Sequence, residues 1–229
     1  MEGKKLKKMK IEKSNNQPKI KNGLFYRFVK RLFDIFSSLF VILLLSWLLL
    51  IILIIQLFVT KGHPIFADPR VGKKGKLFKT LKFRSMHYDA ESNIDKYLTP
   101  EQKEIWLRER KLDNDPRITK FGRFLRKTSL DELPQLFNIF IGQMSVVGPR
   151  PMSQREIYDE FTDEQRAIIF LARPGLTGYW QVNGRSDVDF DSGKRQEMET
   201  TYFYKRSLWF DLKLIFKTIP AVLNRKGAQ

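Results

Sequence analysis

The longest hydrophobic pattern in the chain is an unbroken apolar run from Ile35 to Thr60. These 26 residues include no charged side chain and consist mainly of Leu, Ile, Val and Phe. A run of about 18 to 20 apolar residues is long enough to be embedded in a membrane. A secretory signal peptide would have a shorter hydrophobic region nearer the N-terminus, followed by a small-residue cleavage site. The pattern therefore predicts a membrane-embedded helix.

The charges on both sides of this run bear on its topology. Residues 1–31 contain eleven Lys or Arg residues, and eight more lie between Lys61 and Arg84, with only three carboxylates in the two flanks together. Short basic flanks prefer the cytoplasmic side of a membrane. A spanning helix would place one flank on the opposite side, whereas a re-entrant helix keeps both on the cytoplasmic face. We therefore favour a re-entrant helix, bent near Ser46 and Trp47, over a spanning one.

Shorter periodic segments follow the apolar run. Residues Leu77–Met86 alternate between apolar and polar side chains, as a β-strand does, and residues 89–113 predict a charged surface helix that contains Trp106. Apolar residues recur at helical spacing from Leu208 to Ile219, among basic neighbours. This last helix either packs one face into the core or lies in the headgroup layer of a membrane. The spacing alone fits both arrangements.

Together these elements predict an α/β fold with high helix content and one small β element. The chain is expected to be a monotopic membrane protein, held by the re-entrant helix and by amphipathic interfacial helices. We divide it into a basic, mobile tail over residues 1–31, a membrane helix over residues 32–61 and a cytoplasmic domain over residues 62–226. At 229 residues and 27.2 kDa, the chain has room for one modest catalytic domain.

Composition narrows the chemistry that this domain can perform. The 42 Lys and Arg residues exceed the 25 Asp and Glu residues, and the formal charge of +17 predicts attraction to nucleic acid, anionic lipid or phosphorylated substrates. The chain has no cysteine and only two histidines, His63 and His87. Disulfides, thiolate zinc sites, iron–sulfur clusters and cysteine nucleophiles are therefore excluded. Any metal ion should be bound by oxygen, and both histidines are interpreted as loop or surface residues.

Two adjacent carboxylates, Asp131 and Glu132, follow the basic segment 115–127. Ser129 and Glu132 have the spacing of a helix capping box, although Pro134 fits poorly in that register. Alternatively, one carboxylate is a nucleophile kept ionised by arginines, and the other holds a hard cation that bridges phosphates. The local sequence leaves both interpretations open.

Two other tracts, residues 142–151 and 173–185, combine Gly and Pro with Arg. Such tracts can hold guanidinium groups and backbone N–H groups rigidly toward a phosphate or a base edge. They can equally be turns with solvent-facing arginines. Neither tract matches a Walker loop or a dinucleotide-binding fingerprint.

Six short motifs occur in a characteristic order along the chain. They are Lys82-Phe83-Arg84-Ser85-Met86, Asn114-Asp115-Pro116-Arg117, Thr128-Ser129-Leu130-Asp131-Glu132-Leu133-Pro134-Gln135, Gly148-Pro149-Arg150-Pro151, Arg173-Pro174-Gly175 and Gln181-Val182-Asn183-Gly184-Arg185. Together they resemble the bacterial sugar transferase family, and the likeness covers roughly residues 25–225. Members of that family are small monotopic phosphoglycosyl transferases that begin the assembly of exopolysaccharide, capsule, O-antigen or glycoprotein glycans.

The resemblance implies transfer of a sugar 1-phosphate from a UDP-sugar to a polyprenyl phosphate, such as undecaprenyl phosphate, with release of UMP. It implies that Asp131 attacks the β-phosphorus and forms a covalent intermediate, and that Glu132 helps to hold Mg²⁺, for which Mn²⁺ can substitute. Both carboxylates are thus candidate metal ligands. The implied substrate contacts are Lys82, Arg84, Arg117, Arg126, Pro149, Arg150, Pro151, Arg173, Gln181, Asn183, Arg185 and Glu199.

The same resemblance implies a location and a set of partners. The catalytic domain is expected on the cytoplasmic face of the bacterial inner membrane, in contact with anionic lipid and without nucleic acid. A homo-oligomer is left open, as are the sugar and the glycan pathway.

Two positions depart from the pattern of the family. Its membrane helix usually bends at a Ser-Pro pair, which is Ser46-Trp47 here, and a family Asp corresponds to Glu199. Two alternatives from other functional classes are a membrane-tethered nucleic-acid-binding protein and a scaffold for other assembly enzymes. The first is suggested by the charge of +17. However, anionic lipid accounts for basic residues beside a membrane segment at about 1 kcal/mol each.

Overall fold

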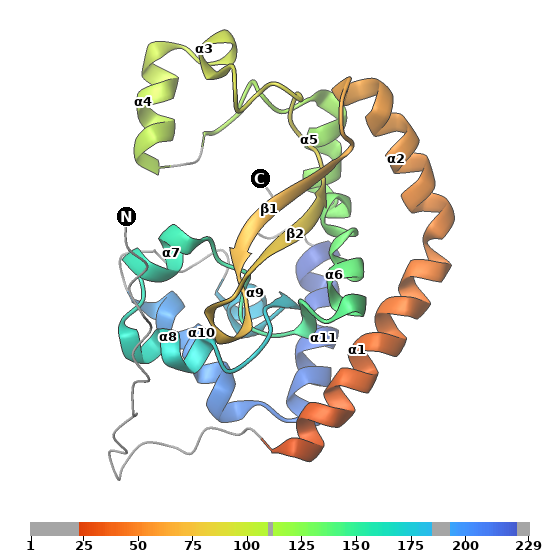
Figure 1. Cartoon of the computed structure of the whole chain (residues 1–229), viewed down its shortest axis with the longest axis vertical. Coiled ribbons are helices and arrows are strands. Elements are labelled where there is room, and N and C mark those ends of the chain that lie inside the picture. The colour runs from red at the N-terminus through yellow and green to blue at the C-terminus, as the bar shows by residue number, and fades with distance from the viewer. Residues whose placement is uncertain (1–22, 110–111, 185–192, 224–229) are drawn as a thin grey trace.

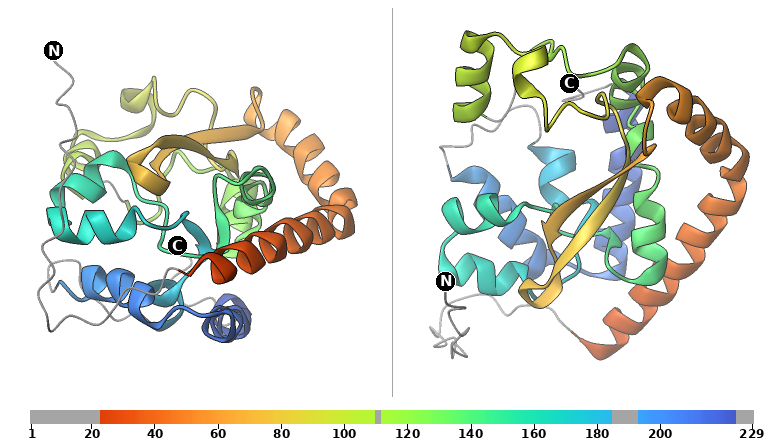
Figure 2. Two further views of the ribbon diagram at one scale, coloured as in Figure 1. Left: turned by 60° about the horizontal axis from the view of Figure 1, so that its bottom comes forward. Right: turned by 45° about the horizontal axis from the view of Figure 1, so that its top comes forward.

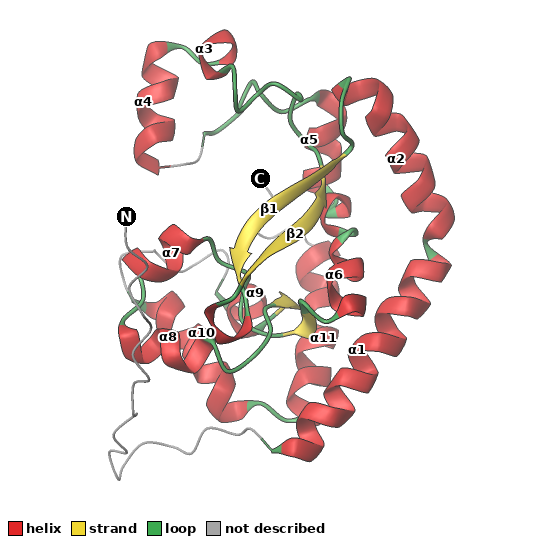
Figure 3. Ribbon diagram, in the orientation of Figure 1, coloured by secondary structure: helices red, strands yellow, loops and turns green. Residues whose placement is uncertain are grey.

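The structure is a computed structural model that describes residues 23–109, 112–184 and 193–223 (Figure 1). Most of the tail predicted over residues 1–31 therefore lies outside the described residues, as does Arg185. Helices dominate the described chain, with two small two-stranded sheets among them (Figure 3). The predicted α/β composition with high helix content is confirmed.

The apolar run forms two helices, α1 (Leu24–Leu44) and α2 (Ser46–Thr60), which meet at a bend of 65°. At the break, the hydroxyl of Ser46 donates a hydrogen bond to the carbonyl of Leu43 at 2.9 Å. Such a bond offers the backbone an alternative partner where a helix is interrupted. In the described part of the chain, no single helix has the length and apolarity to cross a membrane, whereas the bent pair does when taken together.

A β-hairpin follows the bent pair. Strands β1 (Ile65–Val71) and β2 (Leu77–Phe83) pair antiparallel, with Ile65 opposite Phe83 and Val71 opposite Leu77, and the short helix η1 (Lys73–Gly75) lies in the turn. The predicted strand is confirmed, although it ends at Phe83. Beyond that point, Met86 forms only an isolated bridge with Ile118.

Three short helices lie between the hairpin and the bent pair (Figure 1). They are α5 (Lys120–Lys127), η2 (Leu130–Glu132) and α6 (Gln135–Ile141). Ile52 of α2, Phe83 of β2 and Leu125 of α5 form one buried apolar cluster, against which Leu130 and Leu133 pack. The segment that contains Asp131 and Glu132 is thus held between the hairpin and the bent helix pair.

The main core lies on the other side of the hairpin (Figure 2). It is built by β3 (Ser145–Val147), which pairs parallel with β4 (Gly175–Thr177), and by the helices α7 (Gln154–Asp159), α8 (Asp163–Ile169), α9 (Tyr179–Asn183), α10 (Lys194–Lys205) and α11 (Leu208–Leu223). A side chain on Gly175 would come within 2.4 Å of backbone atoms, so glycine is required where the two strands approach. Val147, Ile157, Phe203 and Leu214 are among the buried residues of this core.

The single helix predicted over residues 89–113 is wrong. The chain forms two helices there, α3 (Ile94–Tyr97) and α4 (Pro100–Glu109). The break has a local cause, because a residue before proline is disfavoured in the helical conformation and proline itself suits a helix start. Leu98, just before this Thr99-Pro100 step, is extended.

Helix α11 packs one side against the domain and exposes the other, so it combines features of the core helix and of the interfacial helix that its spacing allowed. Asp211 and Leu214 are buried against the domain, whereas Trp209, Phe216 and Ile219 are exposed. Most of the predicted apolar stripe thus faces away from the core. A helix with exposed aromatic and aliphatic residues beside basic ones suits the membrane interface.

Candidate active site

The carboxylates of Asp131 and Glu132 lie in η2, a short turn between α5 and α6. Ser129 has a positive φ of 56°, a conformation that is costly for residues other than glycine and is often found at functional sites. On either side of the carboxylates, Leu130 and Leu133 pack into the apolar cluster. The two acidic side chains are thus left outside that cluster.

The capping-box interpretation is wrong. The side chain of Ser129 makes no capping hydrogen bond, and η2 is only one turn long. Instead, the Nζ atom of Lys82 lies 3.3 Å from Oε1 of Glu132. Glu132 therefore contacts a predicted substrate-binding residue of the hairpin, and the function of the pair is not explained by a helix cap.

Electrostatics at the pair favour the binding of a cation. Burial, and next the charge of Glu132, raise the pKa of Asp131 to about 6, while Lys82 and Arg126 act in the opposite direction. The two neighbouring cations thus do not fully compensate for burial and for the second carboxylate. At neutral pH Asp131 is therefore mostly ionised.

Arg126 is held beside the pair by the first motif. Its Nε atom donates a hydrogen bond to Oγ of Ser85 at 2.8 Å, and the carbonyl of Ser85 accepts one from the backbone of Thr119 at 3.0 Å. Thr119 caps α5, because its hydroxyl accepts a hydrogen bond from the N–H of Gly122 at 2.9 Å. A Cβ atom on Gly122 would lie 1.9 Å from the Ser85 carbonyl oxygen, so only glycine allows this contact.

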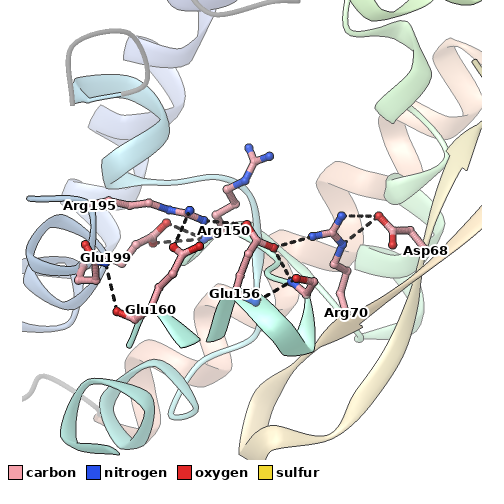
Figure 4. A network of polar contacts seen from close by, with 9 residues as sticks. Asp68, Arg70, Arg150, Glu156, Glu160, Arg195 and Glu199 are labelled. Carbon is pink, nitrogen blue, oxygen red and sulfur yellow. Dashed lines mark hydrogen bonds and ion pairs between the residues drawn. The ribbon is translucent and has the colours of Figure 1, made fainter. Parts of the chain in front are cut away.

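A second cluster of charges lies near the turn of the hairpin (Figure 4). Arg70 of β1 donates to Asp68 at 2.9 Å and to Glu156 of α7 at 3.0 Å. Arg195 of α10 contacts Glu156 and Glu160, each at 3.3 Å. Positive and negative groups therefore alternate from the hairpin to α10, which ties three parts of the domain together.

Arg150 adjoins this cluster. Its backbone N–H lies 3.2 and 3.3 Å from the carboxylate oxygens of Glu199, and its guanidinium lies 5.5 Å from the ring centre of Trp180. The guanidinium of Arg195 lies 4.9 Å from the same ring. Glu199 is only 1% exposed, and burial raises its pKa to about 7. The Pro149-Arg150-Pro151 turn is thus fixed by a buried carboxylate and an aromatic ring.

One face of the hairpin connects the two clusters. Phe66 lies opposite Lys82, Asp68 opposite Thr80 and Arg70 opposite Phe78. Opposed residues of an antiparallel pair share a face, as do residues two apart along a strand. Lys82 and Arg70 therefore lie on one face, separated by four positions or roughly 13 Å at about 3.3 Å per residue. This face, which carries Phe66 and Phe78 as well as the charged side chains, joins the two clusters in the candidate site.

The other predicted substrate contacts lie away from this face of the hairpin or have side chains that are bound to other groups of the protein. Arg117 is only 3% exposed and makes a bidentate pair with Asp115 at 2.7 and 3.0 Å, so its prediction as a substrate contact is not supported by its position. Arg84 donates to the carbonyl of His63 at 2.9 Å, near the end of α2. The side chain of Arg173 points to the carbonyl of Gly142 at 2.6 Å.

The motif that begins at Gln181 lies partly in the interior of the domain and partly at its surface. Gln181 donates to the carbonyl of Leu176 at 3.3 Å, and its Oε1 atom is buried without a hydrogen-bond partner among the described residues. Nε1 of Trp180 is buried in the same way. Asn183 is exposed and receives a hydrogen bond from Lys217 at 3.3 Å.

Sequence reasoning missed Asp68, Arg70, Glu156 and Arg195. Asp68 and Arg70 alternate with Phe66, which is the pattern of one strand face. That signal is present in the sequence, although the same residues also belong to the basic flank of the membrane helix. No comparable local signal marks Glu156 or Arg195, which join the cluster through the tertiary packing of α7 and α10.

The carboxylate pair suits a hard cation. Over the described residues, no group of three or more His, Asp or Glu side chains converges as a metal site. Mg²⁺, however, is commonly held by one or two carboxylates together with substrate phosphates. Asp131 and Glu132 provide such a donor set, and the raised pKa of Asp131 indicates a shortage of positive charge there. The residues present therefore fit Mg²⁺.

Glu199 should make the stability of the protein depend on pH. Its pKa of about 7 in the folded state exceeds the value of 4.5 for the free side chain, so stability falls as pH rises between these values. From pH 4 to pH 8 the wild type should lose about 3 kcal/mol more than Glu199→Gln, which keeps an oxygen for the Arg150 N–H. Urea unfolding in detergent tests this. A Glu164→Gln control, at an exposed position, should follow the wild type; parallel curves for all three proteins would contradict the prediction.

Comparison with known proteins agrees with the motifs. The sequence matches the protein family described as bacterial sugar transferase over residues 25–225. It is 45% identical over 204 residues to a UDP-galactose-lipid carrier transferase of Erwinia amylovora. It is 44% identical over 204 residues to an undecaprenyl-phosphate galactose phosphotransferase of Salmonella typhimurium. Each of these matches covers 88% of this chain and 42% of the relative.

A third relative is of similar length. The exopolysaccharide production protein ExoY of Rhizobium meliloti is 43% identical over 201 residues, which cover 87% of both chains. This chain therefore spans less than half the length of the first two relatives and most of the length of the third.

Proposed function

The chain belongs to the bacterial sugar transferase family, and we propose that it transfers a sugar 1-phosphate from a UDP-sugar to a polyprenyl phosphate, releasing UMP. The observation that carries this proposal is the carboxylate pair of Asp131 and Glu132. It lies between the cations Lys82 and Arg126, on a turn packed against the apolar helix α2. A charged donor and a lipid-linked acceptor can meet at such a place.

In the proposed reaction, Asp131 is the nucleophile. One of its carboxylate oxygens attacks the β-phosphorus of the UDP-sugar, and the bond from that phosphorus to the bridging oxygen breaks, so that UMP leaves. An oxygen of the polyprenyl phosphate then attacks the same phosphorus and the bond to Asp131 breaks. Splitting the transfer into two displacements is the general advantage of covalent catalysis.

The cations near Asp131 and Glu132 have different roles in this mechanism. Lys82 and Arg126 are close enough to influence Asp131, so they lower the repulsion between its carboxylate and the anionic phosphorus centre. Arg150, held by Glu199 and Trp180, lies at the far end of the hairpin face. We assign it to the nucleotide end of the donor, because the face is long enough for an extended diphosphate.

Mg²⁺ would be held by Asp131 and Glu132 together with the donor phosphates. When bound, it supplies positive charge that neutralises the phosphate oxygens. Glu132 contacts Lys82, so this lysine is positioned to share the charge of the carboxylate.

We also propose that the bent pair enters and leaves the membrane on its cytoplasmic face. The bend of 65°, the two basic flanks and the outward-facing apolar residues of α2, such as Leu50 and Phe58, support this arrangement. The exposed stripe of α11 would then lie in the headgroup layer. The location that follows is the inner membrane of a bacterium.

The topology can be tested with single cysteines, since the chain has none of its own. Gly23→Cys introduces a side chain into open space before α1, and Ser92→Cys lies at an exposed position beyond α2. In intact cells both sites should resist a membrane-impermeant thiol reagent, and both should react after permeabilisation. Labelling of the Gly23 site alone in intact cells would indicate a spanning arrangement instead.

The activity is tested by supplying a panel of UDP-sugars with undecaprenyl phosphate and measuring UMP. At least one donor should give UMP release over many turnovers, and this continued release should require the acceptor. If no donor does so while the purified protein binds random DNA in a salt-sensitive manner, the nucleic-acid alternative would replace this proposal.

A further inference from the structure

A cavity of about 300 Å³ lies at the N-terminal end of α1. Its walls come from α1, the hairpin turn, the segment 171–173 and the end of α10. Six cationic side chains line it, against the single carboxylate of Asp34. The cations are Arg27, Lys30, Arg31, Lys73, Arg173 and Arg206.

This cavity is separate from the carboxylate pair. Arg31 donates to the carbonyls of Ile139 and Phe140, each at 2.8 Å, at the C-terminal end of α6. The pair of carboxylates precedes the N-terminal end of the same helix. Lys73 likewise lies in the hairpin turn, and about 17 Å of strand separates that turn from Lys82. The two sites therefore occupy opposite ends of α6 and of the hairpin.

The lining carries a net positive charge, because its six cationic side chains face the single carboxylate of Asp34. Lys30 pairs with Asp211 at 2.7 Å. Arg31 and Arg173 instead donate to backbone carbonyls, which satisfy hydrogen bonds but carry no net charge. The guanidinium of Arg206 stacks 5.8 Å from the ring centre of Tyr26. The hydrogen bonds fix these cations in place without removing their charge.

Two of the cations are better placed than the others to bind a ligand. The side chains of Arg27 and Lys73 make no hydrogen bond or ion pair with any residue that the structure describes. Burial, and then the charges of Arg27 and Arg173, lower the pKa of Lys73. The ammonium group is therefore short of negative charge, which an anion in the cavity would supply.

The edge of the cavity is apolar and exposed. Leu24 and Phe28 line it and are 80% and 64% exposed, and Phe25 beside them is 75% exposed. Exposed aromatic and aliphatic groups next to a cluster of cations match an amphiphile whose charged end is a phosphate. A soluble nucleic acid would not require such an edge.

We propose that this cavity is a phosphate-binding site that takes the headgroup of an anionic membrane lipid, separately from the transfer site. Arg27 and Lys73 would contact the phosphate, with the fixed guanidinium groups of Arg31 and Arg173 around it, and the acyl chains would lie along Leu24 and Phe28. The bound lipid would complete the charge balance where α1 meets the domain, and so hold that end of the helix in the plane of the headgroups.

The test measures lipid binding by native mass spectrometry of the full chain in non-ionic detergent. Phosphatidic acid, phosphatidylglycerol and phosphatidylcholine are added in turn, and inorganic phosphate is added as a separate arm. The wild type should bind one anionic lipid at least about tenfold more tightly than phosphatidylcholine. Arg27→Gln combined with Lys73→Gln should weaken this binding about tenfold or more, because two charge-assisted contacts are lost.

A matched control removes the same charge outside the cavity. Lys76→Gln combined with Lys79→Gln changes two exposed lysines of the hairpin and should leave lipid affinity within about twofold of the wild type. If inorganic phosphate displaces the lipid, the cavity recognises only the phosphate group of the headgroup. If it does not, the acyl chains of the lipid contribute to binding as well. Equal affinity for phosphatidylcholine, or equal loss in both double variants, would overturn the proposal.

The outcome does not depend on the transferase assay. Arg27 and Lys73 lie outside the proposed catalytic site, so UMP release with detergent-solubilised acceptor should stay within about twofold of the wild type in the double variant. Thermal unfolding of both double variants in detergent shows whether they are folded. Lipid binding therefore supports or refutes this cavity even if the proposed transfer reaction is refuted.

Discussion

Replacing Asp131 by Asn should abolish turnover. UMP release should fall by at least about a thousandfold, because an amide cannot form the covalent bond that the proposed first step requires. The substitution preserves the shape of the side chain, so Lys82 and Arg126 keep their places beside it. Continuous detection of UMP with the best donor of the panel gives the rate.

The same substitution should not destabilise the protein. Burial and the charge of Glu132 raise the pKa of Asp131 to about 6, above the value of 3.8 for the free side chain. The folded state thus binds the proton more tightly, and stability falls as pH rises through this interval. Removing the charge removes this effect, so the Tm of Asp131→Asn at pH 7.5 should equal or exceed that of the wild type.

A surface carboxylate provides the matched control for the activity measurement. Asp159 is exposed, and within the described ranges its ion pair is with Arg155 on the same helix, at 3.4 Å. Asp159→Asn should therefore keep wild-type activity. An Asp131→Asn protein that retains a tenth or more of wild-type UMP release would refute the role of Asp131 as nucleophile.

Removing divalent cations should have the second largest effect. With EDTA in excess, UMP release should fall below about 1% of its initial rate. Two carboxylates and a diphosphate would then face one another with Lys82 and Arg126 as the main cations near Asp131 among the described residues. Added Mg²⁺ or Mn²⁺ should restore the rate. Glu132→Gln should raise the Mg²⁺ concentration that gives half-maximal rate.

Glu164→Gln, at an exposed position on α8, serves as the control and should leave the Mg²⁺ dependence unchanged. Full activity in the presence of the chelator would contradict the assignment of Glu132 as a metal ligand. An unchanged Mg²⁺ requirement in Glu132→Gln would contradict it as well.

The membrane-type helix and its bend could be predicted because their causes are local. The apolar run is contiguous, and the bend occurs where Ser46 supplies a hydroxyl for the carbonyl of Leu43, without a proline. The hairpin strand was predictable for the same reason, since its alternation is visible within seven residues. The helix over residues 89–113 was mispredicted because the effect of Pro100 on the residues before it was overlooked.

The candidate site could be predicted only in part. Local motifs identified Asp131, Glu132, Lys82 and Arg150, which the fold places at the two ends of one hairpin face. They do not reveal that Arg70 reaches Glu156 across 86 positions. Pairings of that kind depend on register and tertiary packing, which no local pattern encodes.

The most direct test of the proposed mechanism is the mass of the peptide that contains Asp131. The full-length protein is incubated with its UDP-sugar and Mg²⁺ but without acceptor, quenched in acid and digested. The mechanism predicts that this peptide gains the mass of one sugar phosphate, that the adduct disappears when polyprenyl phosphate is added before quenching, and that Asp131→Asn lacks it. An unmodified peptide under conditions of proven turnover would contradict the covalent mechanism and indicate direct transfer between donor and acceptor.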